Sequence, residues 1–497
     1  MKLYTHYIGG EHLAGTSGRT SPVFNPSSGM HSADVPLASV TEVENAIAVA
    51  EAAFPAWAAT SVVQRSRIMT RFTALLYKYQ PELAELLSLE HGKVIEDAMG
   101  SVLRGIEAAE FACGIPHLQK GEFSDNVAGG IDIYSMRKPL GVVAGITPFN
   151  FPAMIPLWMA SMALATGNAV VMKPSEKDPA CPMRIAEIFV EAGGPAGVFN
   201  VINGDKEAVD ALLNDRRIKA VSFVGSTPIA RYVYDTATRN GKRCQAMGGA
   251  KNHMLILPDA DLDGVANALM GAAYGSAGER CMAISVGVCV GDEVADRLTE
   301  LLTPRIKALK IGPSLNKGLE MGPLVTREHR EKVMNYIQMG VDEGAELVVD
   351  GRDFSLSGHE EGYFLGGSLF DHVTQDMQSY QQEIFGPVLQ LMRVQSFDEG
   401  LALATDHEYG NGTSIFTRSG AAARTYADRV EVGMVGINVP IPVPLAFHSF
   451  GGWKASSFGD HNQYGMEAVR FYTKVKTVTA RWPENTIEAD FSIPTLK

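Results

Sequence analysis

One cysteine of this 497-residue chain stands in a setting that suits a nucleophile. Cys281 ends the segment GERC (278–281), and the small residues at 275–278 would let a substrate approach the backbone closely. A free cysteine has a pKa of about 8.5, and a neighbouring cation such as Arg280, or aligned backbone amides, can lower it. We therefore expect Cys281 to attack a carbonyl carbon. The other cysteines are interpreted as structural residues: Cys113, Cys181, Cys244 and Cys289.

A second candidate residue is the asparagine of PFNFP (148–152), which directly follows an apolar strand predicted at 141–146. The carboxyl ends of parallel strands line the ligand crevice of an open sheet. At such a position the amide of Asn150 can donate a hydrogen bond to a developing oxyanion, with the backbone N–H of Cys281 as a second donor. The alternative is that Asn150 is only a turn residue between two prolines.

Two further segments suit a nucleotide. Lys173 and Glu176 belong to KPSE (173–176), after the next predicted strand; the alternative for both is an ordinary solvated strand end. A carboxylate here accepts a hydrogen bond from a ribose 2′-hydroxyl but repels a 2′-phosphate, so Glu176 favours NAD over NADP. FVGST (223–227) predicts a strand entering a helix N-terminus, whose free amides can bind a pyrophosphate. No GxGxxG fingerprint occurs at a strand–helix junction.

The elements that must position these residues follow an α/β pattern. Between residues 141 and 257, short apolar runs without polar alternation are separated by amphipathic helices, which indicates a parallel sheet covered on both faces. This is a doubly wound, nucleotide-binding architecture. After about residue 258 a second α/β pattern begins, which we interpret as a second domain. Its predicted elements are a strand at 285–291 and helices near 293–309, 329–344 and 397–405.

The N-terminal third predicts a small strand pair followed by helices. Thr41 and Glu44 have the spacing of a capping box ahead of an alanine-rich helix at 42–53. A second helix is predicted from about residue 64, and Pro81 separates it from the next.

Two predicted strands stand apart from any helix, at 130–138 and 473–482. Both alternate apolar and polar residues, as half-buried antiparallel strands do. Exposed strands outside a core tend to pair with another chain, so we expect a homo-oligomer. The alternative is that each strand caps its own domain.

The composition narrows the class of partner. The formal net charge is −13, which argues against binding to nucleic acid or to an anionic membrane, so an anionic substrate must be gathered by local arginines. The N-terminus has no apolar signal segment and no clean run of about 18 apolar residues occurs, so we expect a cytoplasmic protein. The five scattered cysteines lack CxxC spacing, which argues against a disulfide framework and against a metal site.

Taken together, these segments and EIFGPV (383–388) resemble the aldehyde dehydrogenase superfamily over essentially the whole chain. The resemblance implies that Cys281 is the nucleophile and Asn150 the oxyanion donor. It implies a set of residues at the cofactor: Thr147, Phe149, Lys173, Glu176, Lys177, Ser226 and Glu383. It also implies an NAD-binding domain (1–120 and 141–251), a catalytic domain (252–450) and a strand element (121–140 and 471–497) that builds dimers or tetramers.

The chain departs from this family at one catalytic position. Hydrolytic members carry a glutamate in an ELGGK segment, which activates the water that cleaves the thioacyl enzyme, but this chain has QAMGGAKN at 245–252. Alignment on Lys251 places Met247 at the glutamate position, and alignment on the paired glycines places Ala246 there. Neither side chain can take a proton from water. The acyl group must then leave differently, and a thiol acceptor needs less help because it is partly ionised near neutral pH.

That departure, with the long segments at 146–158, 249–254 and 277–283, resembles the CoA-acylating methylmalonate-semialdehyde dehydrogenases. The resemblance implies conversion of methylmalonate or malonate semialdehyde, NAD and coenzyme A to propionyl-CoA or acetyl-CoA, NADH and carbon dioxide. A single methyl group is worth only ~1–3 kcal/mol, so the sequence does not decide between the two substrates.

The substrate carboxylate calls for a cation, and we expect Arg280 and Arg104 to bind it. The alternative for Arg104 is a salt bridge on a helix surface. Two other functions stay open at this point. One is a hydrolytic semialdehyde dehydrogenase that releases a free acid, and the other is a non-catalytic protein that kept the fold.

Overall fold

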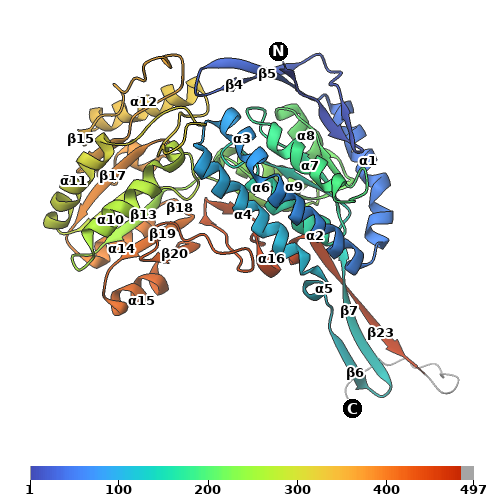
Figure 1. Ribbon diagram of the computed structural model, residues 1–497. Coiled ribbons are helices and arrows are strands. Elements are labelled where there is room, and N and C mark those ends of the chain that lie inside the picture. The colour runs from blue at the N-terminus through green and yellow to red at the C-terminus, as the bar shows by residue number, and fades with distance from the viewer. Residues whose placement is uncertain (1, 483–497) are drawn as a thin grey trace.

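A computed structural model describes residues 2–482 of the chain, so the predictions for residue 1 and for residues 483–497 lie outside the described residues. Figure 1 shows two lobes, each built around one open sheet with helices packed against it, and a narrow arm of strands that extends away from them. The α/β fold class predicted from the sequence is confirmed.

The first lobe contains an eight-stranded sheet with the order β22-β12-β11-β8-β9-β10-β2-β3. Five of its strands are parallel neighbours, and every residue of β8 and β9 is buried, as expected for strands covered on both faces. The strands are β22 (Ser457–Phe458), β12 (Arg243–Met247), β11 (Ile218–Val224), β8 (Val142–Ile146), β9 (Ala169–Lys173), β10 (Phe199–Val201), β2 (His6–Ile8) and β3 (Glu11–Leu13).

The strand order of this sheet reverses beside β8. From β8 the chain continues outward through β9 and β10, then crosses to place β11 on the other side of β8 and β12 beyond it. Ligands of doubly wound sheets bind at the carboxyl ends of the strands at such a reversal. The helices of this lobe are α1 (Val40–Ala59), α2 (Val62–Lys78), α3 (Gln80–His91), α4 (Ile95–Cys113), α5 (Ile115–Leu118), α6 (Met154–Ala165), α7 (Ala180–Glu191), α8 (Lys206–Asn214), α9 (Thr227–Arg239) and α16 (Gly465–Tyr472).

The second lobe contains a seven-stranded sheet with the order β15-β16-β17-β14-β13-β19-β20, which is parallel except for β15. Its strands are β13 (Asn252–Ile256), β14 (Ile284–Val290), β15 (Glu346–Val349), β16 (Ser368–Asp371), β17 (Val388–Val394), β19 (Gly412–Phe416) and β20 (Met434–Ile437). Its helices are α10 (Leu262–Leu269), α11 (Asp292–Lys307), α12 (Arg327–Asp342), α13 (Gln378–Gln381), α14 (Phe397–Asp406) and α15 (Gly420–Arg429). The predicted second α/β pattern is confirmed, but it begins earlier, because β13 pairs with β14 and β19.

The N-terminal helices differ from the prediction in one detail. Helix α1 begins at Val40 and its capping box is formed by Ser39 and Glu42, so the predicted box of Thr41 and Glu44 is wrong. The separation of the next two helices near Pro81 is confirmed. The remaining strands are β1 (Lys2–Leu3), β4 (Thr20–Asn25) and β5 (Met30–Pro36) in one small sheet, and β18 (Tyr409–Gly410) with β21 (Trp453–Lys454) in another.

The arm consists of β6 (Phe123–Ala128), β7 (Ile131–Pro139) and β23 (Thr473–Arg481), with β7 in the middle (Figure 1). The two strands predicted to stand apart from the helices are therefore partners of each other.

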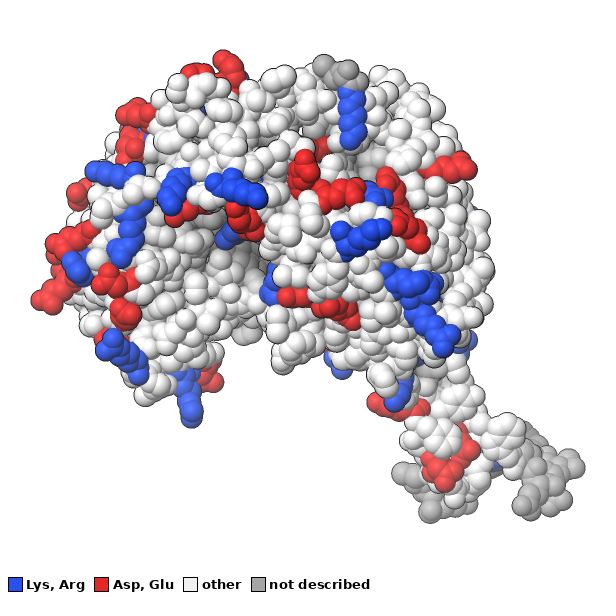
Figure 2. Space-filling model, viewed as in Figure 1, with Lys and Arg blue, Asp and Glu red and all other residues white. Residues whose placement is uncertain are grey.

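On the face drawn in Figure 2, acidic and basic side chains are interspersed. No single helix among residues 2–482 is long and apolar enough to cross a membrane, although α1 and α2 would qualify as a pair that is bent by 116°.

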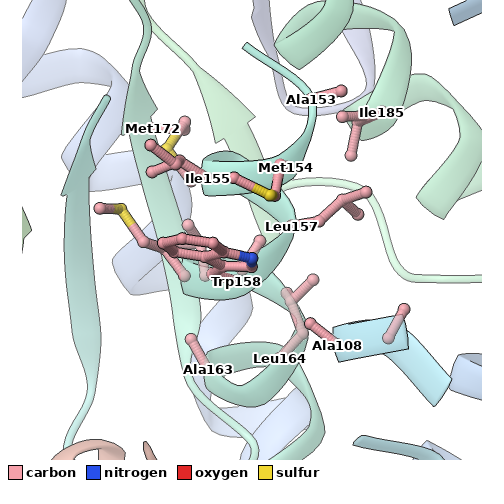
Figure 3. Packing of buried hydrophobic residues seen from close by; sticks show 14 of the residues in the cluster. Ala108, Ala153, Met154, Ile155, Leu157, Trp158, Ala163, Leu164, Met172 and Ile185 are labelled. Carbon is pink, nitrogen blue, oxygen red and sulfur yellow. The ribbon is translucent and has the colours of Figure 1, made fainter. Parts of the chain in front are cut away.

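Helix α6 lies at the centre of the first lobe. All twelve of its residues are buried, and Figure 3 shows Leu157 and Leu164 packed among side chains from neighbouring elements, including Ala108 of α4. Helices α4 and α6 approach each other closely at Gly105, where a Cβ atom would lie 2.7 Å from Cδ1 of Leu157. This close contact fixes the position of the α4 and α6 faces that line the site.

Candidate active site

The chain reaches Cys281 through a strained turn. After α10 come a π-helical turn (Met270–Tyr274) and a short 3₁₀ turn (Gly275–Gly278), in which Ser276, Ala277 and Gly278 have φ angles of 55°, 51° and 73°. Residues other than glycine rarely adopt these angles, so Ser276 and Ala277 each cost about 1–3 kcal/mol, whereas Gly278 adopts its angle without strain. A Cβ atom at Gly278 would lie 2.0 Å from the carbonyl oxygen of Gly386, so only glycine fits there.

Two asparagines fix the backbone of Cys281 itself. The Nδ2 atoms of Asn252 and Asn411 donate to its carbonyl oxygen over 2.9 and 3.0 Å. The side chain of Cys281 lines a cavity of about 320 Å³. The cavity wall is mostly apolar, with residues from α4, from α6 and from the carboxyl ends of β11 and β12, among them Phe151, Trp158, Val224, Met247 and Phe450.

The prediction that Arg280 lowers the pKa of Cys281 is wrong. Burial raises the pKa of the Cys281 thiol to about 11, and the negative charge of Glu383 adds to this effect. The guanidinium of Arg280 lies 2.7 Å from the carboxylate of Asp97. Sequence adjacency could not reveal this partner, because Asp97 is on α4, in a distant part of the chain.

The structure brings Asn150 to the cysteine loop. Asn150 is buried, and its Nδ2 donates to the carbonyl oxygen of Glu279 over 3.1 Å. Its own carbonyl oxygen accepts from Nζ of Lys93 over 2.9 Å. Asn150 is therefore more than a turn residue, since its amide faces the backbone of the loop that carries Cys281.

The dinucleotide candidates meet at the reversal in strand order. Ile146 pairs with Phe223 on one side and with Lys173 on the other, so the segments that follow these strands lie side by side. Lys173 and Glu176 form an ion pair of 3.5 Å. The Oγ1 atom of Thr147 is buried without a hydrogen-bond partner among the described residues.

The first turn of α9 also fits a nucleotide. Ser226 precedes the helix, and its side chain makes no capping hydrogen bond; Pro228 has no N–H, so the backbone N–H groups of Thr227 and Ile229 are the first-turn donors left for a pyrophosphate. The neighbouring candidates Lys177 and Phe149 lie together, with the Lys177 Nζ 4.7 Å from the centre of the Phe149 ring. These residues and the unsatisfied Thr147 hydroxyl fit a bound dinucleotide.

Glu383 approaches the crevice from the second lobe. One of its carboxylate oxygens accepts from the backbone N–H of Ala250 over 2.9 Å, and burial raises its pKa to about 7. Lys251 fixes the preceding segment, because its Nζ donates to the carbonyl oxygens of Ser379 and Gln382 over 2.9 Å each.

Three titratable residues behind the loop were missed by the sequence analysis, namely the buried Glu279 and His91 and the half-buried His329. The carboxylate of Glu279 lies 3.5 Å from Nε2 of His91 and 3.6 Å from Nε2 of His329. Burial raises the pKa of Glu279 to about 8. Its place beside Cys281 was visible in the sequence, but no local pattern connects it with the two distant histidines.

Comparisons with known proteins agree with this geometry. The profile of the aldehyde dehydrogenase family matches residues 12–478. The chain belongs to this family. It is 57% identical, over 498 aligned positions and the full length of both proteins, to a protein of Pseudomonas aeruginosa named malonate-semialdehyde dehydrogenase.

Two solved structures are also similar over nearly the whole chain. One, from Sinorhizobium meliloti 1021, contains NAD; it has a TM-score of 0.97 and 57% identity over 98% of this chain and 99% of its own. The other is a methylmalonate-semialdehyde dehydrogenase from Oceanimonas doudoroffii, with a TM-score of 0.96 and 56% identity over the same shares. The predicted family resemblance and the aldehyde dehydrogenase fold are confirmed.

Within this family fold, the two candidate positions for the missing base are now distinguishable. Met247 ends β12, pairs with Val224 and lines the cavity with Cys281, whereas Ala246 is fully buried in the sheet. Asp97 is the one acidic residue that lines the cavity among the described residues, and it is paired with Arg280. The cavity wall therefore has no free carboxylate that could activate a water molecule.

Both arginines of the predicted carboxylate site line the cavity. Arg104 donates to the carbonyl oxygens of Val443 and Pro444 over 3.0 Å each and forms an ion pair of 2.7 Å with Glu107. The alternative for Arg104 was a salt bridge on the helix surface. The structure shows that Arg104 forms this salt bridge and also lines the cavity. The predicted site residues thus gather around one cavity and one crevice.

Proposed function

We propose that this chain is an NAD-dependent, CoA-acylating dehydrogenase of malonate and methylmalonate semialdehyde. The products would be acetyl-CoA or propionyl-CoA, NADH and carbon dioxide. The observation that supports this is that Met247 lines the cavity with Cys281 and that no unpaired carboxylate lines it among the described residues, so the cavity suits transfer of an acyl group to a thiol better than to water. The relatives named for malonate or methylmalonate semialdehyde support the choice of substrate.

The first chemical step belongs to Cys281 and Asn150. The thiol of Cys281 first releases its proton to solvent, and the small thiolate fraction then adds to the aldehyde carbon. The amide of Asn150 turns from the Glu279 carbonyl to donate to the new oxyanion. Collapse of this adduct expels a hydride and leaves a thioester on Cys281. When bound, NAD supplies the acceptor for that hydride.

The second half of the reaction discharges Cys281. The thioester carbonyl accepts the electron pair that is released when the β-carboxylate leaves as carbon dioxide, and the resulting enolate takes a proton. An external thiol, that of coenzyme A, then attacks the carbonyl carbon, and the sulfur of Cys281 leaves. This attack needs no base on the protein, because a thiol is partly ionised near neutral pH.

The assigned binding roles follow from position and charge. Lys173 and Glu176 would bind the adenosine ribose of NAD, and the negative charge of Glu176 disfavours the extra phosphate of NADP. Arg104 and Arg280 would supply positive charge to the substrate carboxylate at the cavity wall.

The deciding experiment is product identification by mass spectrometry with both semialdehydes and NAD, with and without coenzyme A. Acyl-CoA formation that stops when coenzyme A is omitted supports the proposal. Turnover that continues without coenzyme A and yields a free acid would show that the enzyme hydrolyses its thioester, and it would overturn the proposal. The absence of any NADH burst with either aldehyde would revive the non-catalytic interpretation.

We also propose that the arm assembles the chain into a homodimer or homotetramer. Strands β6 and β23 are the two edges of the arm, and an unpaired edge can pair with another chain. Large apolar side chains are exposed on it, including Phe123 and Val475. Two further expectations stay predictions. One is the cytoplasmic location, and the other is the division into an NAD-binding domain (1–120 and 141–251), a catalytic domain (252–450) and a strand element for assembly (121–140 and 471–497).

A further inference from the structure

A second cavity adjoins the catalytic cavity at Arg280. It has a volume of about 650 Å³ and lies on the second lobe, where α10 and α11 pack against each other (Figure 1). Its wall comes from α10, from the two turns that follow α10 and from the end of α11, and we call it the α11 pocket. Arg280 lines both cavities, so the α11 pocket begins one residue away from Cys281 in the chain.

Positive charge predominates in the α11 pocket. Arg280, Arg305 and Lys310 line it, against one carboxylate among the described residues, that of Glu320. The whole chain has a formal net charge of −13, so this excess of cations runs against the charge of the protein as a whole. Cations gathered in a hollow attract anionic ligands, and guanidinium and ammonium groups are suited to phosphate oxygens.

The two cations at the end of α11 have donors to spare. Arg305 donates from Nη1 to the carbonyl oxygen of Leu301 and from Nη2 to Asp263, which uses two of its five N–H groups. The side chain of Asp263 is 64% exposed, so this ion pair contributes little and can be exchanged for a stronger anion. The backbone N–H of Lys310 donates to Glu320 over 2.9 Å, whereas its ammonium forms no ion pair among the described residues.

Glycines leave space on both sides of Arg280. Gly271 lines the α11 pocket, and a Cβ atom there would have no other atom within 4 Å. Gly100 lines the catalytic cavity, one helical turn after Asp97, the ion-pair partner of Arg280, and a Cβ atom there would be equally free of contacts. The two cavities therefore approach each other at Arg280 between wall positions that have no side chain.

The dinucleotide crevice is less suited to coenzyme A. The ribose of this coenzyme carries a 3′-phosphate in addition to the diphosphate. In the proposed function Glu176 binds the adenosine ribose of NAD, and its negative charge would repel a 3′-phosphate for the same reason that it repels the 2′-phosphate of NADP. The α11 pocket offers the opposite charge.

We propose that the α11 pocket binds the nucleotide end of coenzyme A, with Arg305 and Lys310 at its phosphates, and that the pantetheine arm passes Arg280 to reach Cys281. This inference rests on the proposed function and adds the site of its acyl acceptor. The arm is uncharged, which suits the mostly apolar wall of the catalytic cavity. There the sulfur of the arm bonds to the acyl carbon, and the sulfur of Cys281 leaves and takes up the proton that the coenzyme thiol released to solvent.

The test compares coenzyme A with pantetheine, which has the same thiol arm and no phosphate. Arg305→Gln and Lys310→Gln each remove one cation from the full-length enzyme. Because a charge-assisted hydrogen bond is lost at an exposed site, we expect each variant to raise KM for coenzyme A roughly five- to tenfold. KM for pantetheine should change by less than about twofold, because pantetheine has no phosphate to lose a contact.

A matched control is present on the same helix. Arg297 of α11 also forms an exposed ion pair, with Glu300, but it does not line the pocket. It lies roughly 12 Å before Arg305 along the helix, which exceeds the Debye length of about 8 Å in physiological salt. Arg297→Gln should therefore leave the ratio of the two KM values unchanged.

A steric variant tests the same pocket without changing its charge. Since a side chain at Gly271 would project into open space, Gly271→Leu should fill part of the pocket and raise KM for coenzyme A. An unchanged KM in this variant would contradict the proposed site. Thermal unfolding of each variant shows whether it is folded.

Inhibition by adenosine 3′,5′-bisphosphate separates the α11 pocket from the dinucleotide crevice. This compound resembles the nucleotide end of coenzyme A and has no thiol. We expect it to compete with coenzyme A and not with NAD, and Arg305→Gln should weaken the inhibition. Competition with NAD instead would place coenzyme A in the dinucleotide crevice and overturn the inference.

The outcomes distinguish this inference from the function on which it rests. If the wild-type enzyme forms no acyl-CoA from either semialdehyde, the proposed function fails and the inference fails with it. If the wild-type enzyme forms acyl-CoA, but Arg305→Gln and Lys310→Gln change KM for both thiols equally or for neither, only the assigned site of coenzyme A is overturned.

Discussion

The Nδ2 atom of Asn150 lies 3.1 Å from the carbonyl oxygen of Glu279, two residues before Cys281, the proposed nucleophile. The backbone on either side of this contact is fixed, by Lys93 at Asn150 and by Asn252 at Cys281. The amide is therefore held beside the loop that carries Cys281, where it can exchange the Glu279 carbonyl for an oxyanion by turning. Hydrogen-bond donors at a developing oxyanion are a main source of transition-state stabilisation.

Replacing Asn150 by alanine should remove that stabilisation. We expect kcat to fall by roughly 10²- to 10³-fold, because one oxyanion donor is lost, with a much smaller change in KM. Stopped-flow measurement of the NADH burst would show the effect on the hydride step. Asn150→Asp has nearly the same size without the N–H donor, so near-normal activity in that variant would contradict the assigned role.

Replacing Met247 by glutamate should restore hydrolysis. Met247 lines the cavity beside Cys281, and a carboxylate at this position could take a proton from water. We expect steady NADH formation without coenzyme A, with a free carboxylic acid as the product. Met247→Gln has a similar size but no basic group, and it should stay dependent on coenzyme A. Equal behaviour of the two variants would show that the missing base is not what prevents hydrolysis.

The reactivity of Cys281 should rise steeply with pH in the free enzyme. Since burial and Glu383 raise its thiol pKa to about 11, the thiolate fraction increases about tenfold per pH unit below that value. Alkylation by iodoacetamide, mapped by mass spectrometry, should accelerate continuously between pH 7 and 10. Glu383→Gln removes a negative neighbour, so it should lower the pKa and speed alkylation. A plateau below pH 9 would contradict the buried-thiol assignment.

The sequence predicted elements well where local pattern determines them. Strands such as β8 and β9 are continuous apolar runs, and their burial on both faces follows from that. Strand β12 was missed because Arg243 and Gln245 interrupt its apolar residues, although it carries Met247 to the cavity. The capping box was placed at Thr41 because two boxes with the same spacing overlap there, and the structure uses the one at Ser39.

The site was predictable in its residues but not in its electrostatics. Asn150 meets the loop that carries Cys281, as the two segments suggested, because it follows the carboxyl end of β8 at the reversal in strand order. The partner of Arg280 was not predictable, since Asp97 reaches it from a helix that no local rule connects with the loop. Desolvation of Cys281 likewise depends on walls from several distant segments, so the direction of its pKa shift could be obtained only from the folded structure.

The arm should be needed for assembly. Phe123 and Val475 lie on its two edge strands and are 65% and 57% exposed in the single chain. Charged residues in their place would oppose burial of an edge against another chain, so Phe123→Asp with Val475→Asp should lower the mass in solution towards the 53.5 kDa of one chain. Multi-angle light scattering measures this directly.

The control for that experiment is an exposed apolar residue outside the arm. Val63 on α2 is 49% exposed, and Val63→Asp adds the same kind of charge without touching β6 or β23. It should leave the assembly intact. A wild-type chain that has the mass of a monomer, or an arm variant that keeps the mass of the assembled wild type, would show that these strands only cap their own sheet. The alternative left open by the sequence would then be the correct one.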